Sequence, residues 1–243
     1  MNFMPTFKFR FRDNFFSALT MAGVLLGVVA LIVLVATSKS NGADRVTLTA
    51  ISFFAAICFL IIGLVSIRDD LRMGGQFGVS RPTVFAANVA AAVAGAVVLA
   101  VLGEVVTIVG QAAAAAFPNL FFSDFYQMLF LKTTGPMSLS QHAASAFFNF
   151  TLQMLSYAGG VVLSLLFFRL SKRWSVIAGI GLGVALLWGF PYVAWRFASV
   201  VAPAVRWLLS TLGNWTLAVL PATAVLLFLG WLLLRRAPVK SAK

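Results

Sequence analysis

Glu104 is the one carboxylate inside a long apolar stretch of this sequence, where it could line an aqueous cavity or pair with an arginine. Acid–base and nucleophilic catalysis need several converging groups. Glu104 has no obvious partner carboxylate, and His142 has no obvious Cys or Ser-Asp set. Cys58 is the only cysteine, so neither an internal disulfide nor a Cys/His metal cluster can be built. The residue types therefore argue against an enzyme and against redox or zinc chemistry.

Uncharged polar residues form a second group of candidates within the apolar stretches. They are Asn88, Asn149, Gln153 and Tyr157. Such side chains bond to a neighbouring helix more often than to a substrate. We predict a substrate path lined by Glu104, Asn149, Gln153 and Tyr157. Helix–helix hydrogen bonds are the alternative for the three uncharged residues, and pairing with an outer arginine is the alternative for Glu104.

Nucleotide hydrolysis is excluded as an activity of this chain alone. A phosphate-binding loop needs Gly-x-x-x-x-Gly-Lys-Ser/Thr, and the sequence contains no Gly-Lys pair. Two Gly-x-x-x-Gly spacings, Gly23/Gly27 and Gly179/Gly183, predict close packing between helices.

The composition indicates which elements must position these residues. Of 243 residues, 61% are hydrophobic and only 10% are charged, and the mean hydropathy of +1.00 is typical of a polytopic membrane protein. A spanning helix needs about 20 mainly apolar residues. The sequence therefore predicts an all-α fold, a single transmembrane domain over residues 1–243 with six spans. These spans cover 15–36, 46–67, 83–110, 143–170, 175–195 and 214–234.

The distribution of Lys and Arg predicts that both chain ends lie in the cytoplasm. With the N-terminus inside, the cytoplasmic segments hold thirteen of these residues and the outer segments hold five. Basic residues accumulate on the cytoplasmic side of membrane proteins. The net charge of +12 is scattered between apolar runs rather than gathered on one face, so topology explains it better than nucleic-acid binding.

Three segments outside the spans have unusual compositions. Residues 1–14 alternate Phe with Lys and Arg and also repeat Phe at i, i+4, which favours an interfacial helix; a frayed basic tail is the alternative. Residues 111–141 are apolar but too short to span, and we expect them in the outer interface or folded back into the bundle. Residues 196–213 carry Pro203 between two apolar halves, which predicts a re-entrant hairpin or an interfacial helix. Aromatic anchoring is the alternative for both outer segments.

The stretch RDDLRMGGQFGVSRPTVF, residues 68–85, concentrates charge, glycine and proline. A plain turn needs only a few polar residues. The stretch therefore predicts a cytoplasmic surface that a partner recognises, with a solvated loop beside lipid phosphates as the alternative.

Within this stretch the pattern Gly78-x-Ser80-Arg81-x-x-x-Phe85 resembles a motif of the membrane subunit of type-2 ABC exporters. Six spans, cytoplasmic ends and a basic amphipathic N-terminus are similar to that family over nearly the whole chain, while the residue-level match is this one short motif. The resemblance implies that residues 68–82 form a coupling segment docked on a separate ATPase subunit, which binds ATP and Mg. It also implies an outer re-entrant hairpin at 196–213. The long apolar segment 111–141 departs from the family pattern.

The resemblance gives the individual residues of the stretch expected roles. The charges at 68–72 would make a polar dock, and Gly74-Gly75 would let the chain reverse direction. Ser80 would cap the next helix while Pro82 occupies its first turn. The coupling residues expected on this basis are Arg68, Asp69, Asp70, Arg72, Gly78, Ser80, Arg81 and Phe85.

The resemblance implies an export permease, and the apolar outer segments with few internal charges favour an amphipathic or lipophilic cargo, such as a peptide, drug or lipid, moved out of the cytoplasm. One six-span copy is half of a transport path, so we expect a second copy or a paralogue, two ATPase subunits, surrounding lipid, and a multi-pass location in a bacterial cytoplasmic membrane. No cofactor, metal or nucleic acid is expected on this chain. The alternative is a non-transporting scaffold or sensor subunit of a membrane complex.

Overall fold

The computed structural model describes residues 3–38, 46–49, 51–76, 78–117, 120–133, 135–170, 172–185, 188, 192 and 195–235. Helices dominate, which confirms the all-α fold class, and two short strands are added to them. The elements in chain order are α1 (Phe3–Ser38), β1 (Val46–Thr49), α2 (Ile51–Gln76), α3 (Arg81–Ala116), β2 (Leu120–Ser123), the π-helical turn η1 (Gln127–Leu131), α4 (Leu139–Arg169), α5 (Lys172–Val184), α7 (Ala198–Leu208) and α8 (Leu212–Arg235).

Four of the described helices, α1, α3, α4 and α8, are long and apolar enough to cross a membrane. The apolar part of α2, Ser52–Ile67, is shorter, and α5 has 13 residues. Gly179 and Gly181 near the end of α5 are poor helix formers, which is consistent with a short helix. The structure thus supports four spanning helices, and a topology with six spans stays a prediction.

The N-terminal segment and the first predicted span form one helix. α1 runs unbroken from Phe3 to Ser38, so no separate interfacial helix is present at 1–14 within the described residues. Four phenylalanines at i, i+4 spacing, from Phe3 to Phe15, stack along one face with ring centroids 5.8–6.1 Å apart. The second predicted span also differs, because strand β1 occupies its first residues and the helix begins at Ile51.

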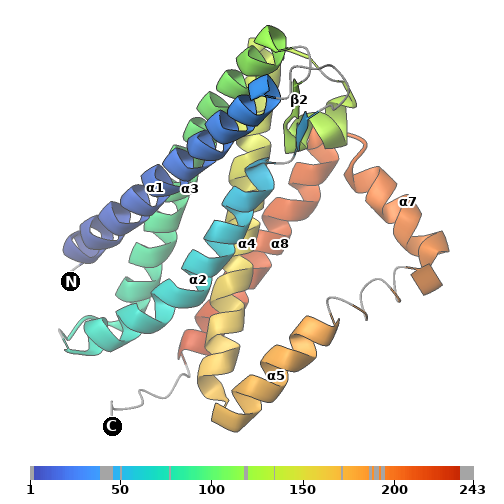
Figure 1. The fold of residues 1–243 in the computed structure, drawn as a ribbon. Helices are drawn as coiled ribbons and strands as arrows, with labels where there is room; N and C mark the ends of the chain where they lie inside the picture. Colours follow the sequence, from blue (N-terminus) through green and yellow to red (C-terminus); the bar gives the residue numbers. More distant parts are fainter. Residues whose placement is uncertain are drawn as a thin grey trace.

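The long helices pack into a bundle in which α1 lies along α3, α2 along α4, and α4 along α8 (Figure 1). α5 and α7 lie to one side of this bundle. A shared core joins α2, α3, α4 and α8 through Phe59, Leu99, Tyr157, Val161 and Leu234.

α2 and α4 approach each other closely at Gly63 and Gly160. A Cβ added to Gly63 would overlap the carbonyl oxygen of Tyr157, and one added to Gly160 would overlap that of Leu60. The closest helix packing is therefore at other glycines than those of the two Gly-x-x-x-Gly spacings. Around three of those glycines an added Cβ would meet nothing within 4 Å: Gly23, Gly27 and Gly179.

A small parallel ribbon closes one end of the bundle. β1 pairs with β2, with Val46 opposite Leu120 and Thr49 opposite Ser123. β2 buries Leu120 and Phe122 and exposes Phe121, as its alternating faces require. We call this end, which also carries η1, the strand end, and we call the opposite end, which carries the connection between α2 and α3, the turn end.

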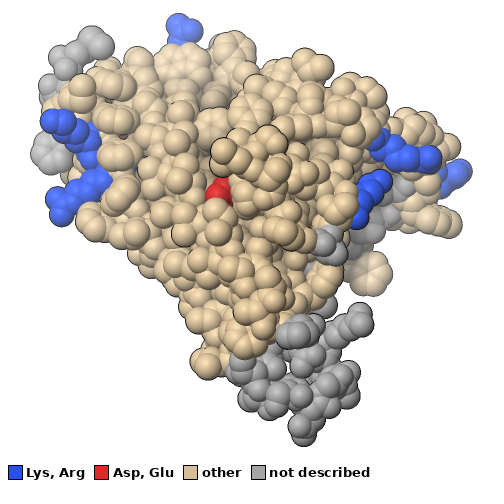
Figure 2. Space-filling model, turned by 90° about the horizontal axis from the view of Figure 1, so that it is seen from above, with Lys and Arg blue, Asp and Glu red and all other residues tan. Residues whose placement is uncertain are grey.

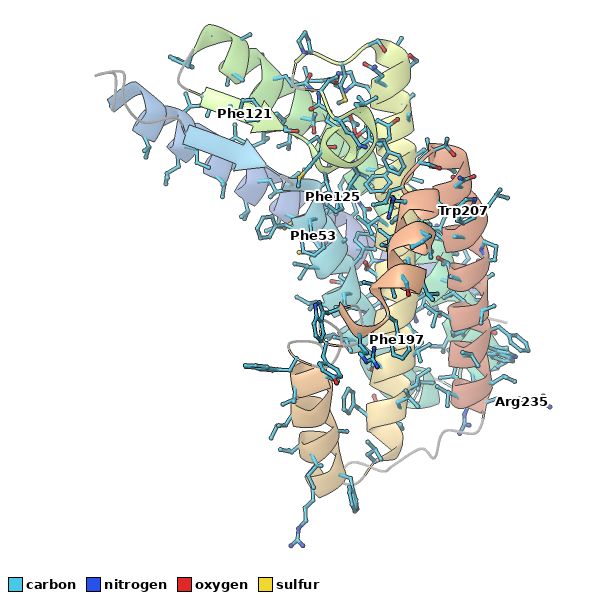
Figure 3. The ribbon with its side chains drawn as sticks, turned by 90° about the vertical axis from the view of Figure 1, so that its right-hand side faces the viewer. Phe53, Phe121, Phe125, Phe197, Trp207 and Arg235 are labelled. Atoms are coloured by element: carbon cyan, nitrogen blue, oxygen red, sulfur yellow. The ribbon has the colours of Figure 1, made fainter. Side chains whose placement is uncertain are left out.

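Aromatic contacts hold the segment after β2 against the helices. Phe125 lies beside Phe53 of α2, with ring centroids 5.7 Å apart (Figure 3). Phe130 packs edge-on against Phe148 of α4 at 5.4 Å, and Phe148 contacts Trp215 of α8 at 4.8 Å. This part of the predicted outer segment 111–141 is therefore folded onto the bundle.

The stretch 196–213 contains one helix, α7, followed by a turn into α8. None of the residues of α7 is buried, and Pro203 lies inside the helix. Phe197 and Trp207 both point away from the bundle core (Figure 3) and are more than half exposed. The described residues thus form a single exposed helix here rather than a hairpin of two arms.

Candidate functional site

One face of α4 carries a stripe of polar side chains. His142, Ser145, Asn149 and Gln153 follow one another at helical spacings of three and four, so they lie on one side of the helix. The start of α4 is held by a capping box, in which Ser138 Oγ accepts from Gln141 N at 3.4 Å and Gln141 Oε1 accepts from Ser138 N at 2.8 Å. The capping box thereby fixes where α4 begins, three residues before His142.

Glu104 of α3 is contacted by the first three residues of this stripe. Ser145 Oγ lies 2.6 Å from Glu104 Oε1, and His142 Nδ1 lies 2.9 Å from Oε2. Asn149 Nδ2 donates to Glu104 Oε1 at the longer distance of 3.4 Å. Glu104, the one carboxylate within a predicted span, is therefore contacted by three polar side chains of one helix.

A second carboxylate, Asp124, reaches the same serine from the end of β2. Ser145 Oγ lies 3.1 Å from Asp124 Oδ2. Ser52 Oγ of α2 donates to the other oxygen, and Tyr126 N donates to Oδ2 at 3.2 Å. Asp124 is fully buried, and the adjacent Gln127 fastens its loop by accepting from Asp124 N at 3.1 Å. We call Glu104, Asp124, Ser145, His142 and Ser52 the carboxyl cluster.

Within the described residues, the carboxyl cluster has no Lys or Arg partner, and His142 is the one basic group that contacts it. Burial raises the pKa of the neighbouring Tyr126 phenol, so that group stays neutral near pH 7. Viewed from the strand end, uncharged side chains cover most of the surface, basic ones lie toward its edges, and acidic atoms show near its centre (Figure 2).

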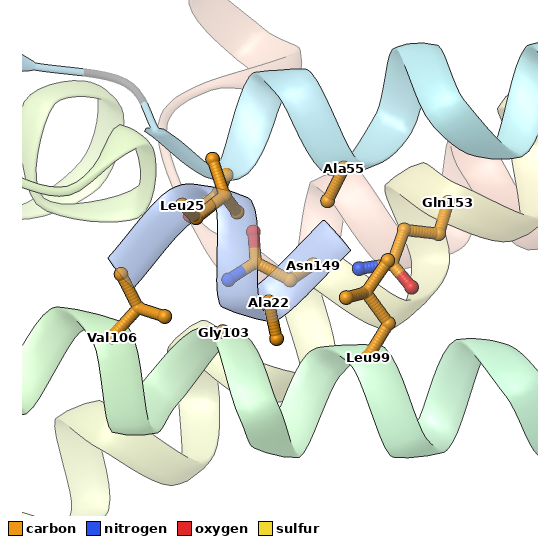
Figure 4. A pocket seen from close by; sticks show the side chains of 9 residues that line it. Ala22, Leu25, Ala55, Leu99, Gly103, Val106, Asn149 and Gln153 are labelled. Atoms are coloured by element: carbon orange, nitrogen blue, oxygen red, sulfur yellow. The ribbon is translucent and has the colours of Figure 1, made fainter. Parts of the chain in front are cut away.

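A cavity of about 10 Å³ lies beside the carboxyl cluster, between α1, α2, α3 and α4 (Figure 4). That is about the space that one water molecule needs. Ser52, Asn149 and Gln153 give it polar walls, and apolar side chains such as Leu25 and Leu99 complete the lining. Asn149 Oδ1 and Gln153 Oε1 are buried without a hydrogen-bond partner, so the cavity has unused hydrogen-bonding capacity.

A second buried polar group lies at the turn end. Asp70 of α2 accepts two hydrogen bonds from the guanidinium of Arg10 and one from Asn88 of α3. Arg10 also donates to Ser66 O at 3.2 Å and to Asp13 at 3.0 Å. Arg10, Asp70 and Asn88 are each at least nine-tenths buried. We call these three residues the arginine cluster; it ties together α1, α2 and α3.

The predicted substrate-path residues are thus split. Glu104, Asn149 and Gln153 come together at the carboxyl cluster and its cavity. Tyr157 lies further along α4, near Arg10 and Asp70, in the core that α2, α3 and α4 share. Among the described residues, its hydroxyl meets no partner at full hydrogen-bond geometry, and the Ser66 hydroxyl is the neighbouring polar group that acts on it.

The predicted coupling residues are also split. Arg68, Asp69 and Arg72 lie in α2, but their side chains fall outside the described residues. Asp70 is a correction, because it is buried in the arginine cluster and cannot serve as a surface charge. Gly74 and Gly75 do not end the helix or reverse the chain direction, because α2 continues to Gln76.

The reversal between α2 and α3 comes at residues 78–80. Gly78 has φ of 65°, a backbone conformation that favours glycine. Val79 N donates to Gly74 O at 2.8 Å, and Ser80 stands at the N-cap of α3 with Pro82 in the first turn. The Ser80 hydroxyl does not cap the helix backbone as predicted, because it bonds to Thr83 Oγ1 at 2.7 Å.

Two further residues of the Gly78–Phe85 pattern connect this turn to α8. Arg81 Nη1 donates to the carbonyl oxygen of Arg235 at 3.2 Å. Phe85 packs on Trp231, with ring centroids 5.7 Å apart. The start of α3 is therefore joined to the last turns of α8, and Arg235 marks that end in Figure 3.

Sequence reasoning missed most of the carboxyl cluster. His142 was set aside for want of a partner, and Ser52, Asp124 and Ser145 were not singled out. The spacing of His142, Ser145, Asn149 and Gln153 was a usable signal, because it marks one polar face of a helix. Nothing local pointed to Asp124, since the pairing of β1 with β2 brings it in from a distant part of the chain.

The carboxyl cluster can exchange hydrogen bonds and protons, because it combines two carboxyls, an imidazole and two hydroxyls. Groups of three or more His, Cys, Asp or Glu placed to hold a metal ion do not occur among the described residues. Comparison of the chain with family models, with curated proteins and with solved structures gave no match.

Proposed function

We propose that this chain is the membrane-spanning subunit of an ATP-driven exporter similar to the type-2 ABC family. In this proposal it moves an amphipathic or lipophilic cargo out of the cytoplasm, as one half of a dimer that works with two ATPase subunits. Four apolar helices of spanning length and the absence of a phosphate-binding loop from the sequence support a membrane subunit that relies on a separate ATPase.

The connection between the turn and α8 is the observation that carries the proposal. Gly78 and Ser80 are exposed at the turn end, where a partner could contact them. Arg81 and Phe85 link the same turn to the last residues of α8 through the contacts at Arg235 and Trp231. A partner that pushes on this turn would therefore move α3 and α8 together, as a coupling element must.

Because Asp70 is buried, it is not part of the surface that an ATPase would contact in this proposal. The charge of Asp70 is already neutralised inside the protein by Arg10. In this proposal docking uses the exposed residues of the turn, and Asp70 holds the underlying helices in place. Reversing its charge would damage the fold and is therefore a poor test of docking.

Arg81→Ala tests the proposal in vesicles that contain the chain and the ATPase encoded beside its gene. The lost hydrogen bond to Arg235 should cost less than about 1.5 kcal/mol of folding stability. We expect the ATPase to remain bound while cargo export per ATP hydrolysed falls at least about tenfold, since about 1.4 kcal/mol of lost coupling suffices.

Gly78→Val should act differently, because a β-branched residue is strained at a φ of 65°. We expect it to reduce the amount of ATPase subunit bound. Arg12→Ala, at an exposed position of α1, is the control and should leave binding and export unchanged. If the parent chain recruits no ATPase at all, a non-transporting scaffold or sensor subunit becomes the better explanation. Export at the parental rate in both turn variants would contradict the coupling role of the turn.

A further inference from the structure

The carboxyl cluster contains one hydroxyl hydrogen for two carboxyl contacts. Ser145 Oγ lies 2.6 Å from Glu104 and 3.1 Å from Asp124. A serine hydroxyl donates a single hydrogen bond. If both carboxyls were ionised, one of these contacts would set a lone pair of Ser145 against a carboxylate oxygen. Both contacts are satisfied fully when one of the two acids donates to Ser145, which requires that it carry a proton.

The surrounding donors identify which acid is protonated. Asp124 accepts from Ser52 Oγ, from Tyr126 N and from Ser145, so three donors stabilise its anion. Around Glu104 the amide of Asn149 stands off at 3.4 Å. The short contact of 2.6 Å suits a carboxylic acid O–H that donates to Ser145. The proton therefore belongs on Glu104, and Ser145 passes its own hydrogen bond on to Asp124.

The charged groups that act on Glu104 are Asp124, at the end of β2, and His142, on α4. From α2 the cluster receives the uncharged Ser52. The residues that α1 places in this part of the bundle, Leu25 and Val29, are apolar. Two like charges this close and this buried repel each other strongly, and His142 is the one basic group described beside them to offset the repulsion. The chemistry of the site thus favours a retained proton.

A route for that proton is present on each side of Glu104. His142 is partly exposed and touches Glu104 Oε2 at 2.9 Å. On the other side, Asn149 leads into the cavity, where two unpartnered amide oxygens are positioned to hold a water molecule. The cluster is therefore connected to the surface at the strand end and to a small polar space inside the bundle.

We propose that Glu104, Ser145 and Asp124 form a proton-binding site that is loaded through His142 from the strand end of the bundle. In the loading step the imidazolium of His142 gives its Nδ1 proton to Oε2 of the Glu104 carboxylate, 2.9 Å away, which leaves a neutral imidazole and a neutral carboxylic acid. A half-turn of the carboxyl group then brings the O–H to the side of Ser145. A hydronium ion from bulk water protonates His142 again. This inference rests on the contacts of the cluster alone and holds whether or not an ATPase binds the turn.

Infrared spectroscopy of the full chain in lipid nanodiscs tests the site directly, because a protonated carboxyl has its own C=O stretch, which shifts in D2O. We expect the parent chain to show this band at pH 7 and Glu104→Gln to lose it. Asp13→Asn, which removes a carboxyl with a side chain 59% exposed, should retain the band.

Two further variants keep the test decisive. Ser145→Ala removes the shared hydroxyl and should shift the frequency of the band, even if Glu104→Gln does not fold. Asp124→Asn removes the like charge that favours the proton on Glu104, so the band should be lost at a lower pH than in the parent. Absence of the band from the parent, its survival in Glu104→Gln, its persistence to an equal or higher pH in Asp124→Asn or an unchanged frequency in Ser145→Ala would each overturn the proposal.

Discussion

The arginine cluster and the carboxyl cluster lie at opposite ends of α2, and they balance their charges in different ways. At the turn end, the two oxygens of Asp70 both contact the guanidinium of Arg10. At the strand end, Glu104 and Asp124 share Ser145, and His142 is the basic neighbour. Both groups are buried, so neither can rely on water to screen it.

The difference separates a structural group from one that can change state. A buried bidentate Arg–carboxylate pair is geometrically specific and holds its helices in one arrangement. Two carboxyls that share one hydroxyl can gain or lose a proton without breaking a helix contact. We therefore expect the arginine cluster to contribute stability and the carboxyl cluster to contribute chemistry.

The largest expected effect follows from breaking the arginine cluster. Arg10→Met leaves the carboxylate of Asp70 buried and unpaired, which should lower the free energy of unfolding by about 3–5 kcal/mol. Arg12→Met is the matched control on the same helix; it removes only an exposed contact with the Phe16 ring and should cost about 0.5–1 kcal/mol. Denaturant titration in detergent micelles measures both. The double variant Arg10→Met/Asp70→Leu should recover part of the loss, and equal stability of all three would contradict a structural ion pair.

The same chemical change made in both clusters sharpens the comparison. Asp70→Asn removes a charge that bonds Arg10 and should cost about 1.5–3 kcal/mol. Glu104→Gln replaces an acid that is already neutral in our proposal, so its cost should stay below about 1 kcal/mol at pH 7. Denaturant titration in detergent micelles measures the loss of stability in each of the two variants. A greater loss in Glu104→Gln than in Asp70→Asn would mean that Glu104 is an ionised structural residue.

The helix crossing between the two clusters gives the smallest effect. Gly63→Ala places a methyl group against the backbone of α4, and such overpacking costs about 1–3 kcal/mol. Gly23→Ala, where the added Cβ would meet nothing within 4 Å, should instead be neutral or slightly stabilising. Thermal unfolding of the two variants tests this. A Gly63→Ala variant that unfolds at the parental temperature would show that α2 and α4 can move apart without loss of stability.

The parts of the fold that could be predicted were those set by local sequence. Hydropathy located α1, α3, α4 and α8, and the i, i+4 spacing of the phenylalanines indicated the helix at Phe3–Phe15. The start of α2 could not be predicted, because β1 exists only through its pairing with β2. The burial of Asp70 could not be predicted for a similar reason, since its partner Arg10 lies sixty positions earlier in the chain. The polar residues at membrane depth, Glu104, Asn149 and Gln153, were found from their composition alone, whereas His142, Ser145 and Asp124 were missed because only the fold shows that they contact Glu104 or its neighbours.

The short apolar part of α2 has a consequence for the surrounding bilayer. The helix begins at Ile51 and its last apolar residue before the charged stretch is Ile67, so at 1.5 Å per residue this part is about 26 Å long, against a hydrocarbon thickness of about 30 Å. Polar clusters at both ends of this segment prevent it from sliding to match a thicker membrane. Lipids beside α2 should therefore be compressed by several ångströms, at a cost of fractions of a kcal/mol per ångström. The protein should partition into the thinner of two coexisting membrane domains, and lengthening the acyl chains should tilt or distort the bundle on the side of α2 first.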